Sequence, residues 1–491
     1  MALIRKHAAR NTVVAYFGVI LGYVNLTIIF PKLLEQSVFG LTQVLIAAML
    51  FISNFGSLGL KMSTIRFRPV FESKQEIATN FFAFMLTICL IGIALSLVSL
   101  YVFQDFITDR FSKNSPLFVD YYRLVYWLAI FGVTNMFLDS YCQSIFQSIV
   151  AAFYREVVMR LLQLAAVLLY WFGFLDLNGF LVTFVMVQAL YSILIGATLI
   201  LGKHIVWNWN FENISKSLRI DIAKFSIIAI IGGNALLTNV DVLFVGSMIG
   251  LEATAIYAVA VAIGNILLIP SRSMLRVANA VAADAWVQND LPKLNRVYKK
   301  SAITNLIIGG VVFLIIAHCI PEILSYLPKN FEAGTATIIV LALSKLIHLS
   351  TGINSGIIAT SKDYAMNLVF NVMSAFGLWG FMYFLIPMYG IMGAAMAMLY
   401  VALLQNTAKV VFLQAKYELQ PYNRSYFVVI LIGLFTYLVI GLIPEFWTNP
   451  IIGLGVKASL TTALFLGPIY FFKLSNDFNL LVGDVFKKLK F

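Results

Sequence analysis

Charged side chains are scarce in this chain of 491 residues, because Asp, Glu, Lys and Arg together make up only 11% of it, whereas hydrophobic residues make up 61%. A typical soluble domain carries about 25% charged residues. With a mean hydropathy of +0.91, the chain has too little polar surface to cover a water-soluble globule of this size. That excludes a soluble enzyme and a disordered chain, and it predicts an all-α, polytopic membrane protein.

Cysteines and catalytic motifs are also scarce. Cys89, Cys142 and Cys319 lie in apolar runs without disulfide or metal-ligand spacing, so we expect buried thiols and exclude a disulfide scaffold. The absence of a phosphate-binding Gly-Lys-Ser/Thr loop argues against an ATP-driven pump. The predicted outer loops are too short for the catalytic acids of a sugar polymerase. We therefore expect a protein that is not an enzyme and has no cofactor, with H⁺ or Na⁺ as a possible coupling ion.

Apolar stretches of bilayer-spanning length, about 20 residues, recur along the whole sequence. They predict about fourteen transmembrane helices, near residues 11–30, 41–60, 77–103, 117–138, 155–175, 179–201, 222–249, 253–275, 301–320, 333–360, 364–386, 389–413, 425–444 and 450–472. Cytoplasmic loops are enriched in Lys and Arg. With a cytoplasmic N-terminus, 25 of the 34 basic residues fall in inner segments, and the outer loops hold only Lys32, Arg110, Lys113 and Lys329. Both termini are therefore predicted to be cytoplasmic, and the net charge of +12 requires no nucleic-acid partner.

The sequence also contains an internal repeat. Segment 24–40 resembles 240–257, and segment 154–179 resembles 364–390. This predicts two parallel six-helix lobes, as in transporters whose repeats are related by an axis along the membrane normal. The predicted domains are an N-lobe (1–215, helices 1–6), a C-lobe (216–415, helices 7–12), and two accessory helices with a cytoplasmic tail (416–491).

Two segments resemble a known family. PKLLEQSVFGLTQVLIAAMLFISNFGSLGLKMSTIRF (31–67) resembles the start of polysaccharide and O-antigen flippases of the multidrug/oligosaccharidyl-lipid/polysaccharide exporter superfamily, and LIPMYGIMGAAMAMLY (385–400) resembles the turn between their eleventh and twelfth helices. The resemblance implies alternating-access movement of a lipid-linked oligosaccharide, carried on a polyprenyl pyrophosphate, from the inner to the outer leaflet of a bacterial inner membrane. It implies membrane lipids and polysaccharide polymerase or assembly proteins as partners. An ion-coupled small-molecule or multidrug exporter of the same superfamily is the alternative.

Ionisable residues at membrane depth are candidates for the transport path, because they are costly there and usually face a cavity. Lys345 lies near the middle of the window 333–360, and His348 follows on the same helical face. We expect Lys345 to face the lumen, with a helix–helix polar contact as the alternative. Four other basic residues lie nearer to helix ends and are expected to extend to the membrane interface, namely Arg123, Arg160, Lys409 and Lys457.

A polar stripe is predicted in the seventh span, where Asn234, Thr238 and Asp241 are spaced i, i+4 and i+7. Asn25 holds the position in the first repeat that Asp241 holds in the second. Such a stripe could line the lumen, bind a coupling ion or join neighbouring helices.

Arginine pairs are predicted at the cytoplasmic ends of two pseudo-equivalent spans. Arg66 and Arg68 end the second span, and Arg272 and Arg276 end the eighth. Positive-inside topology alone could explain these pairs. Alternatively, they capture the pyrophosphate, because Arg binds phosphate bidentately. The interior-negative membrane potential would then favour outward movement of the anion, so strong ion coupling is not required.

Overall fold

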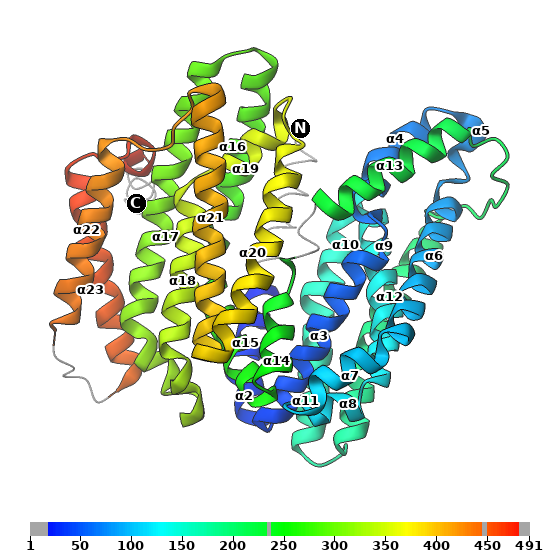
Figure 1. Cartoon of the computed structure of the whole chain (residues 1–491), viewed down its shortest axis with the longest axis horizontal. Coiled ribbons are helices and arrows are strands. Elements are labelled where there is room, and N and C mark those ends of the chain that lie inside the picture. Colours follow the sequence, from blue (N-terminus) through cyan, green and yellow to red (C-terminus); the bar gives the residue numbers. More distant parts are fainter. Residues whose placement is uncertain (1–17, 233–236, 444–448, 481–491) are drawn as a thin grey trace, which may run out of the picture. The chain divides into compact units, whose positions relative to one another are not determined.

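The computed structural model describes residues 18–232, 237–443 and 449–480 (Figure 1). Within these ranges the regular elements are all helices. Nine helical segments there are long and apolar enough to cross a bilayer, and a tenth if α15 and α16 together form one broken span. The predicted all-α membrane fold is confirmed, while the count of fourteen spans and the cytoplasmic termini stay predictions.

The backbone divides into two compact units, unit 1 (Met1–Ala258) and unit 2 (Val259–Phe491). The helices of unit 1 are η1 (Asn25–Ile29), α2 (Phe30–Leu33), α3 (Gln36–Gly56), α4 (Leu60–Glu72), α5 (Gln75–Ala78), α6 (Phe81–Val102), α7 (Gln104–Ser112), α8 (Pro116–Asp120), α9 (Arg123–Ser144), α10 (Ser148–Phe153), η2 (Tyr154–Val158), α11 (Met159–Trp171), α12 (Leu177–Leu201), α13 (Lys216–Gly232) and α14 (Val240–Met248). The division falls within α15 (Leu251–Asn265). Unit 2 continues with α16 (Leu268–Val287), α17 (Leu291–Leu324), η4 (Lys329–Gly334), α18 (Thr335–Ser350), α19 (Asn354–Thr360), α20 (Met366–Tyr389), α21 (Ile391–Tyr417), α22 (Arg424–Gly441) and α23 (Pro450–Phe471). The three predicted domains stay a prediction.

Small residues let the long helices of unit 1 approach closely. A Cβ atom on Gly92 of α6 would lie 1.8 Å from the carbonyl oxygen of Gly56 of α3, and one on Gly132 of α9 would lie 2.1 Å from Ser53 Oγ. The two repeats also meet in this unit, because Gln36 Nε2 donates a hydrogen bond to the carbonyl of Glu252 at 3.0 Å. These close contacts explain why the first spans are rich in Gly and Ser.

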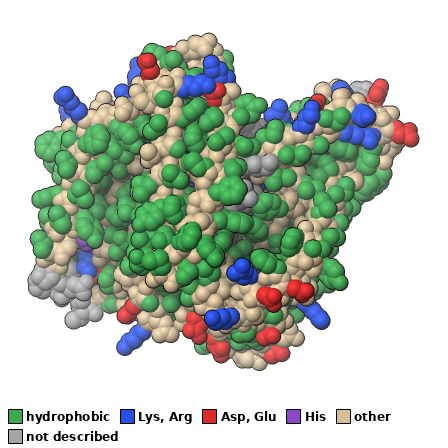
Figure 2. Space-filling model, viewed as in Figure 1, with side chains coloured by type: hydrophobic (Ala, Val, Ile, Leu, Met, Phe, Trp, Pro, Cys, Tyr) green, Lys and Arg blue, Asp and Glu red, His purple; other side chains and the backbone are tan. Residues whose placement is uncertain are grey.

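The outward faces of the long helices are hydrophobic. On α22 the side chains of Phe427, Leu431, Phe435 and Leu438 are each more than half exposed. Hydrophobic side chains cover much of the visible surface between helix ends, and charged ones gather near those ends (Figure 2). Such a surface matches the hydrocarbon core of a bilayer flanked by polar headgroups.

Helix α23 is joined to α17 within unit 2 by a buried ion pair. Lys457 Nζ of α23 lies 2.5 Å from Glu322 Oε1 of α17, and the two side chains are only 10% and 11% exposed. Lys457 lies seven residues inside α23, roughly 10 Å along its axis at about 1.5 Å per residue. The prediction that Lys457 reaches the membrane interface is therefore wrong.

Candidate functional site

A cavity of about 520 Å³ lies within unit 1, a size typical of small-molecule sites, which span about 300–1,000 Å³. Its walls come from the first helix (Gly18–Leu33, which includes η1 and α2), from α3, α9, α11 and α12, and from the start of α4. Its charged lining residues are Lys61, Asp139, Arg155 and Arg160. Amide side chains from several helices, Asn25 among them, contribute most of its neutral polar lining.

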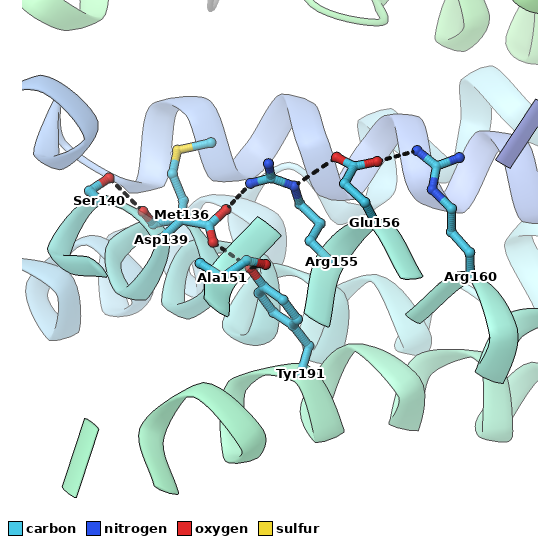
Figure 3. Close-up of polar contacts among 8 residues, drawn as sticks. All are labelled: Met136, Asp139, Ser140, Ala151, Arg155, Glu156, Arg160 and Tyr191. Carbon is cyan, nitrogen blue, oxygen red and sulfur yellow. Dashed lines mark hydrogen bonds and ion pairs between the residues drawn. The ribbon is translucent and has the colours of Figure 1, made fainter. Parts of the chain in front are cut away.

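The charged residues form an alternating chain along one wall (Figure 3). Arg155 Nη1 lies 2.5 Å from Asp139 Oδ2, and Arg155 Nε lies 3.1 Å from Glu156 Oε1. The other carboxylate oxygen of Glu156 accepts from Arg160 Nη2 at 2.7 Å. The Tyr191 hydroxyl donates to Asp139 Oδ1. Each arginine is thus fixed by a carboxylate while remaining part of the cavity wall.

Two π-helical turns bring these residues together. The turn η2 contains Arg155 and Glu156 and joins α10 to α11 without a break, and the turn η1 begins at Asn25. A π-turn inserts an extra residue, changes the direction of the side chains around it and is frequent at functional sites. Asn25 Nδ2 donates to the carbonyl of Arg160 at 3.0 Å, which connects the two turns. Asn25 is only 3% exposed, and its Oδ1 has no hydrogen-bond partner in the described part of the chain.

Two glycines of the first helix, Gly18 and Gly22, leave space for the side chains of the alternating ion pairs. A Cβ on Gly22 would lie 1.0 Å from Arg160 Nη1, and one on Gly18 would lie 2.6 Å from the carbonyl oxygen of Glu156. We expect Gly22→Ala to displace the Arg160 guanidinium, because a side chain can move, and to lower transport with little loss of stability. Gly18→Ala should instead lower the melting temperature, because it meets backbone. Thermal unfolding of both purified variants, compared with their transport rates, tests this difference; equal melting temperatures would contradict it.

The charge balance of the site is positive. Lys61, Arg155 and Arg160 carry three positive charges, against the carboxylates of Asp139 and Glu156. Lys61 is exposed and has no ion-pair partner among the residues described. Arg155 and Arg160 keep 46% and 30% of their side chains exposed despite their partners. The arrangement suits an anionic group, which Arg can bind bidentately.

Arg160 differs from its prediction. It lies twelve residues into the continuous helical segment that starts at Ser148, roughly 18 Å along the axis at about 1.5 Å per residue, and its guanidinium pairs with Glu156. Because its guanidinium is held by Glu156 in the cavity lining, Arg160 does not extend to the membrane interface, and that prediction is wrong. Asn25, in contrast, lines the cavity.

The arginine pair of the second span lies outside this cavity's lining. Arg66 is exposed and its guanidinium carbon lies 4.4 Å from the centre of the Phe225 ring. Arg68 pairs with Glu72 at 2.7 Å and donates to the Tyr141 hydroxyl at 3.3 Å. In unit 2, Arg272 and Arg276 are exposed on α16. Their joint role in capturing a substrate stays a prediction.

The predicted polar stripe of the seventh span does not lie on one continuous helix. Asn234 lies outside the described residues. Thr238 is in a turn that ends at Asn239, whose φ of +55° is left-handed, and α14 starts only at Val240. The stripe is therefore wrong as a helical face, because the backbone turns between its members. Asp241 is 6% exposed and accepts a hydrogen bond from the Tyr257 hydroxyl at 3.0 Å.

In unit 2, Lys345 is half-buried on α18, and His348 is exposed one turn later. Lys409 of α21 is 3% exposed, so the prediction that it reaches the membrane interface is wrong. No group of three or more His, Cys, Asp or Glu side chains among the described residues could hold a metal ion.

Four residues of the site were not predicted from the sequence, namely Asp139, Arg155, Glu156 and Tyr191. Asp139, Arg155 and Glu156 lie near the ends of predicted spans, which suggested loops, whereas Tyr191 lies in the middle of the predicted span 179–201 and carried no signal of its own. One signal was available, because Glu156 and Arg160 have the i, i+4 spacing of a helical ion pair. Such a pair inside an apolar segment indicates a polar interior rather than an interface.

Two protein-family models match this chain. A model described as polysaccharide biosynthesis protein matches residues 4–282, more than half of the chain. The chain belongs to the polysaccharide biosynthesis protein family. A second model, described as MatE, matches residues 227–385. This polysaccharide biosynthesis protein is therefore a multi-pass membrane transporter of the multidrug/oligosaccharidyl-lipid/polysaccharide exporter superfamily, as the sequence motifs predict.

One relative in sequence and several solved structures are similar to most of this chain. An uncharacterized membrane protein of Methanocaldococcus jannaschii is 23% identical over 468 residues, which cover 89% of this chain and 88% of that protein. The lipid II flippase MurJ, in an inward closed conformation, has a TM-score of 0.69 at 14% identity and covers 94% of this chain and 99% of its own. An inward-facing multidrug resistance MATE family transporter has a TM-score of 0.61 at 15% identity, with 83% and 94% covered. A mutant of the MATE transporter VcmN of Vibrio cholerae has a TM-score of 0.57 at 14% identity, with 85% and 99% covered.

Proposed function

We propose that this protein is a flippase that moves a lipid-linked oligosaccharide, carried on a polyprenyl pyrophosphate, across the cytoplasmic membrane by alternating access. The surface polymer would be a polysaccharide such as O-antigen, and the membrane a bacterial inner membrane. Assembly enzymes such as a polysaccharide polymerase would receive the flipped product. The observation that carries the proposal is the excess of basic over acidic side chains in the unit 1 cavity.

The chemistry of the cargo explains this preference. A pyrophosphate cannot enter hydrocarbon without compensation, because burying an unpaired ion is very costly. Arg155 and Arg160 are already oriented by Asp139 and Glu156, so little conformational entropy is lost when they turn toward a phosphate. The neutral amides of the cavity can hydrogen-bond sugar hydroxyls. The lipid tail would remain in the bilayer, against the hydrophobic outer faces of the helices.

Deletion of the gene tests the proposed function. We expect polyprenyl-linked oligosaccharide to accumulate on the inner leaflet and the surface polysaccharide to be lost, because unflipped substrate cannot be polymerised outside. Extraction and mass analysis of the lipids measures the accumulated intermediate and identifies its sugars, and a separate assay of the cell surface measures the polysaccharide. Reintroduction of the gene should restore both readouts, and a deletion strain with unchanged lipid intermediates would contradict the proposal.

A second candidate function is supported by one feature of the same cavity. Asp139 places a carboxylate in its wall, and the MatE model covers part of the chain. These observations favour an ion-coupled exporter of small, cationic molecules. The deletion strain separates the two, because loss of an exporter should raise sensitivity to cationic compounds while lipid intermediates stay unchanged.

A further inference from the structure

A helix in unit 2 is interrupted inside a predicted span. α18 ends at Ser350 and α19 starts at Asn354, although the apolar window covers 333–360 as one stretch. Gly352 occupies the turn between them with φ of +65°, and a Cβ there would lie 2.5 Å from Ser301 Oγ. Discontinuous helices of this kind form ion and substrate sites in transporters. The polar side chains beside the break are therefore candidates for such a site.

Amide and hydroxyl oxygens gather where the break meets α21. Thr351 Oγ1 donates to Asn406 Oδ1 at 2.9 Å. Asn354 Nδ2 donates to both oxygens at 3.1 Å, and Ser355 Oγ donates to Asn354 Oδ1 at 3.2 Å. Thr351, Asn354 and Asn406 are each less than 5% exposed. Neutral oxygens of this kind are the ligands that a hard cation takes.

Lys409 supplies the positive charge at this oxygen cluster. Its Nζ donates to Ser355 Oγ at 3.0 Å, and Ser355 is its only hydrogen-bond or ion-pair partner within residues 18–232, 237–443 and 449–480. Lys409 is 3% exposed, and it lies eight residues before the end of α21, roughly 12 Å along the helix at about 1.5 Å per residue. An ammonium buried without a carboxylate is destabilised by several kcal/mol, and loss of its proton removes that penalty.

Among the described residues, no carboxylate lies within ion-pair distance of Lys409, and those on the neighbouring elements are exposed or paired elsewhere. On α18, Lys345 and His348 add basic groups, and the charges of Lys345 and Lys409 both act on the His348 ring. α16, which packs against α19, carries Arg272, Arg276 and Asp284. The linker between α19 and α20 carries Lys362 and Asp363. The carboxylate of Asp363 lies 2.7 Å from the Lys416 ammonium and accepts a hydrogen bond from the Tyr417 hydroxyl. Both contacts hold the pKa of Asp363 below its usual value. Asp363 is thus already engaged on the neighbouring turns of α21.

We propose that Lys409 is the coupling-proton site of this transporter. Its ammonium lies beside the oxygen cluster and donates to Ser355 Oγ. During the cycle, Nζ releases one proton to water, becomes a neutral amine, and is reprotonated from the other side of the membrane. That Lys409 couples proton movement to transport rests on the proposed function. That Lys409 binds and releases a proton does not rest on it.

Proton binding by the purified full-length protein in detergent tests the site without any substrate. After a jump between about pH 9 and about pH 6, far from the unperturbed lysine range near pH 10.4, a pH indicator should show about one more proton bound per chain by wild type than by Lys409→Met. Lys416→Met is the matched control, because this exposed lysine of the same helix is paired with Asp363, and it should match wild type. Equal uptake by wild type and Lys409→Met would overturn the proposal.

Ser355→Ala provides a second measurement if Lys409→Met does not fold. This variant removes the acceptor of the ammonium, so the uptake should remain one proton but its midpoint should move; an unchanged midpoint would overturn the proposal. In proteoliposomes with polyprenyl-linked oligosaccharide, a pH gradient should change the transport rate of wild type and not of Lys409→Met. If wild type moves no such lipid, the proposed function fails, while the proton count still decides the site.

Discussion

Replacing Arg160 by Gln is expected to lower the rate of lipid-linked oligosaccharide transport at least about tenfold while the protein stays folded. Arg160 is the least exposed cation of the unit 1 cavity, and a hydrogen bond to a charged group is worth about 1.5–3 kcal/mol. Since about 1.4 kcal/mol corresponds to a factor of ten, losing one such bond in the transport pathway accounts for the expected effect. Initial rates in proteoliposomes and restored surface polysaccharide in the deletion strain measure it, and thermal unfolding checks the fold.

The double variant Glu156→Gln/Arg160→Gln tests whether Arg160 binds the anionic substrate or only forms an ion pair with Glu156. It removes one charge of each sign, so the net charge of the cavity wall is preserved and Glu156 is not left short of a partner. If Arg160 contacts the anion, the double variant stays as defective as Arg160→Gln. If Arg160 only neutralises Glu156, transport returns, which would contradict the proposed role. Arg123→Gln, exposed on α9 of the same unit, should transport like wild type.

The architecture was predictable because hydropathy is a local property of the sequence. Each apolar window contains a helix or a pair of helices, and the three cysteines are buried without disulfides, as predicted. The turn at Asn239 inside window 222–249 and the break inside window 333–360 were not predicted. Turn residues such as Asn239 and Gly352 interrupt the helix there without interrupting the hydropathy.

The candidate site was harder to predict because it depends on how helices meet. The recess of Gly18 and Gly22 and the π-turn η2 together place Glu156 and Arg160 against the first helix. The spacing of residues within one segment of sequence predicts neither the π-turn η2 nor which of its residues meet the first helix. Asn25 was predicted from the repeat, and it lies on the same cavity because the first helix carries both the recess and the π-turn η1.

Glu322→Gln is expected to lower the melting temperature of the protein strongly. The change leaves the Lys457 ammonium 10% exposed and without its carboxylate. Breaking one partner of a buried ion pair typically costs about 3–5 kcal/mol, because an uncompensated charge remains. The effect should be felt between α17 and α23, the helices that the pair joins. Thermal unfolding of the purified variant in detergent measures it.

The other ion pair between α17 and the C-terminal segment is the matched control. Lys300 Nζ lies 2.9 Å from Asp477 Oδ1, but these side chains are 58% and 40% exposed, so Asp477→Asn should cost no more than about 1 kcal/mol. The double variant Glu322→Leu/Lys457→Met should regain most of the lost stability, because apolar residues of similar size often replace a buried ion pair without loss. Equal melting temperatures for Glu322→Gln and Asp477→Asn would show that burial does not set the strength of the first pair. A full recovery by the double variant would instead mean that the intact pair adds less to stability than either charge would cost if left alone. The role of the pair would then be to fix which face of α23 meets α17.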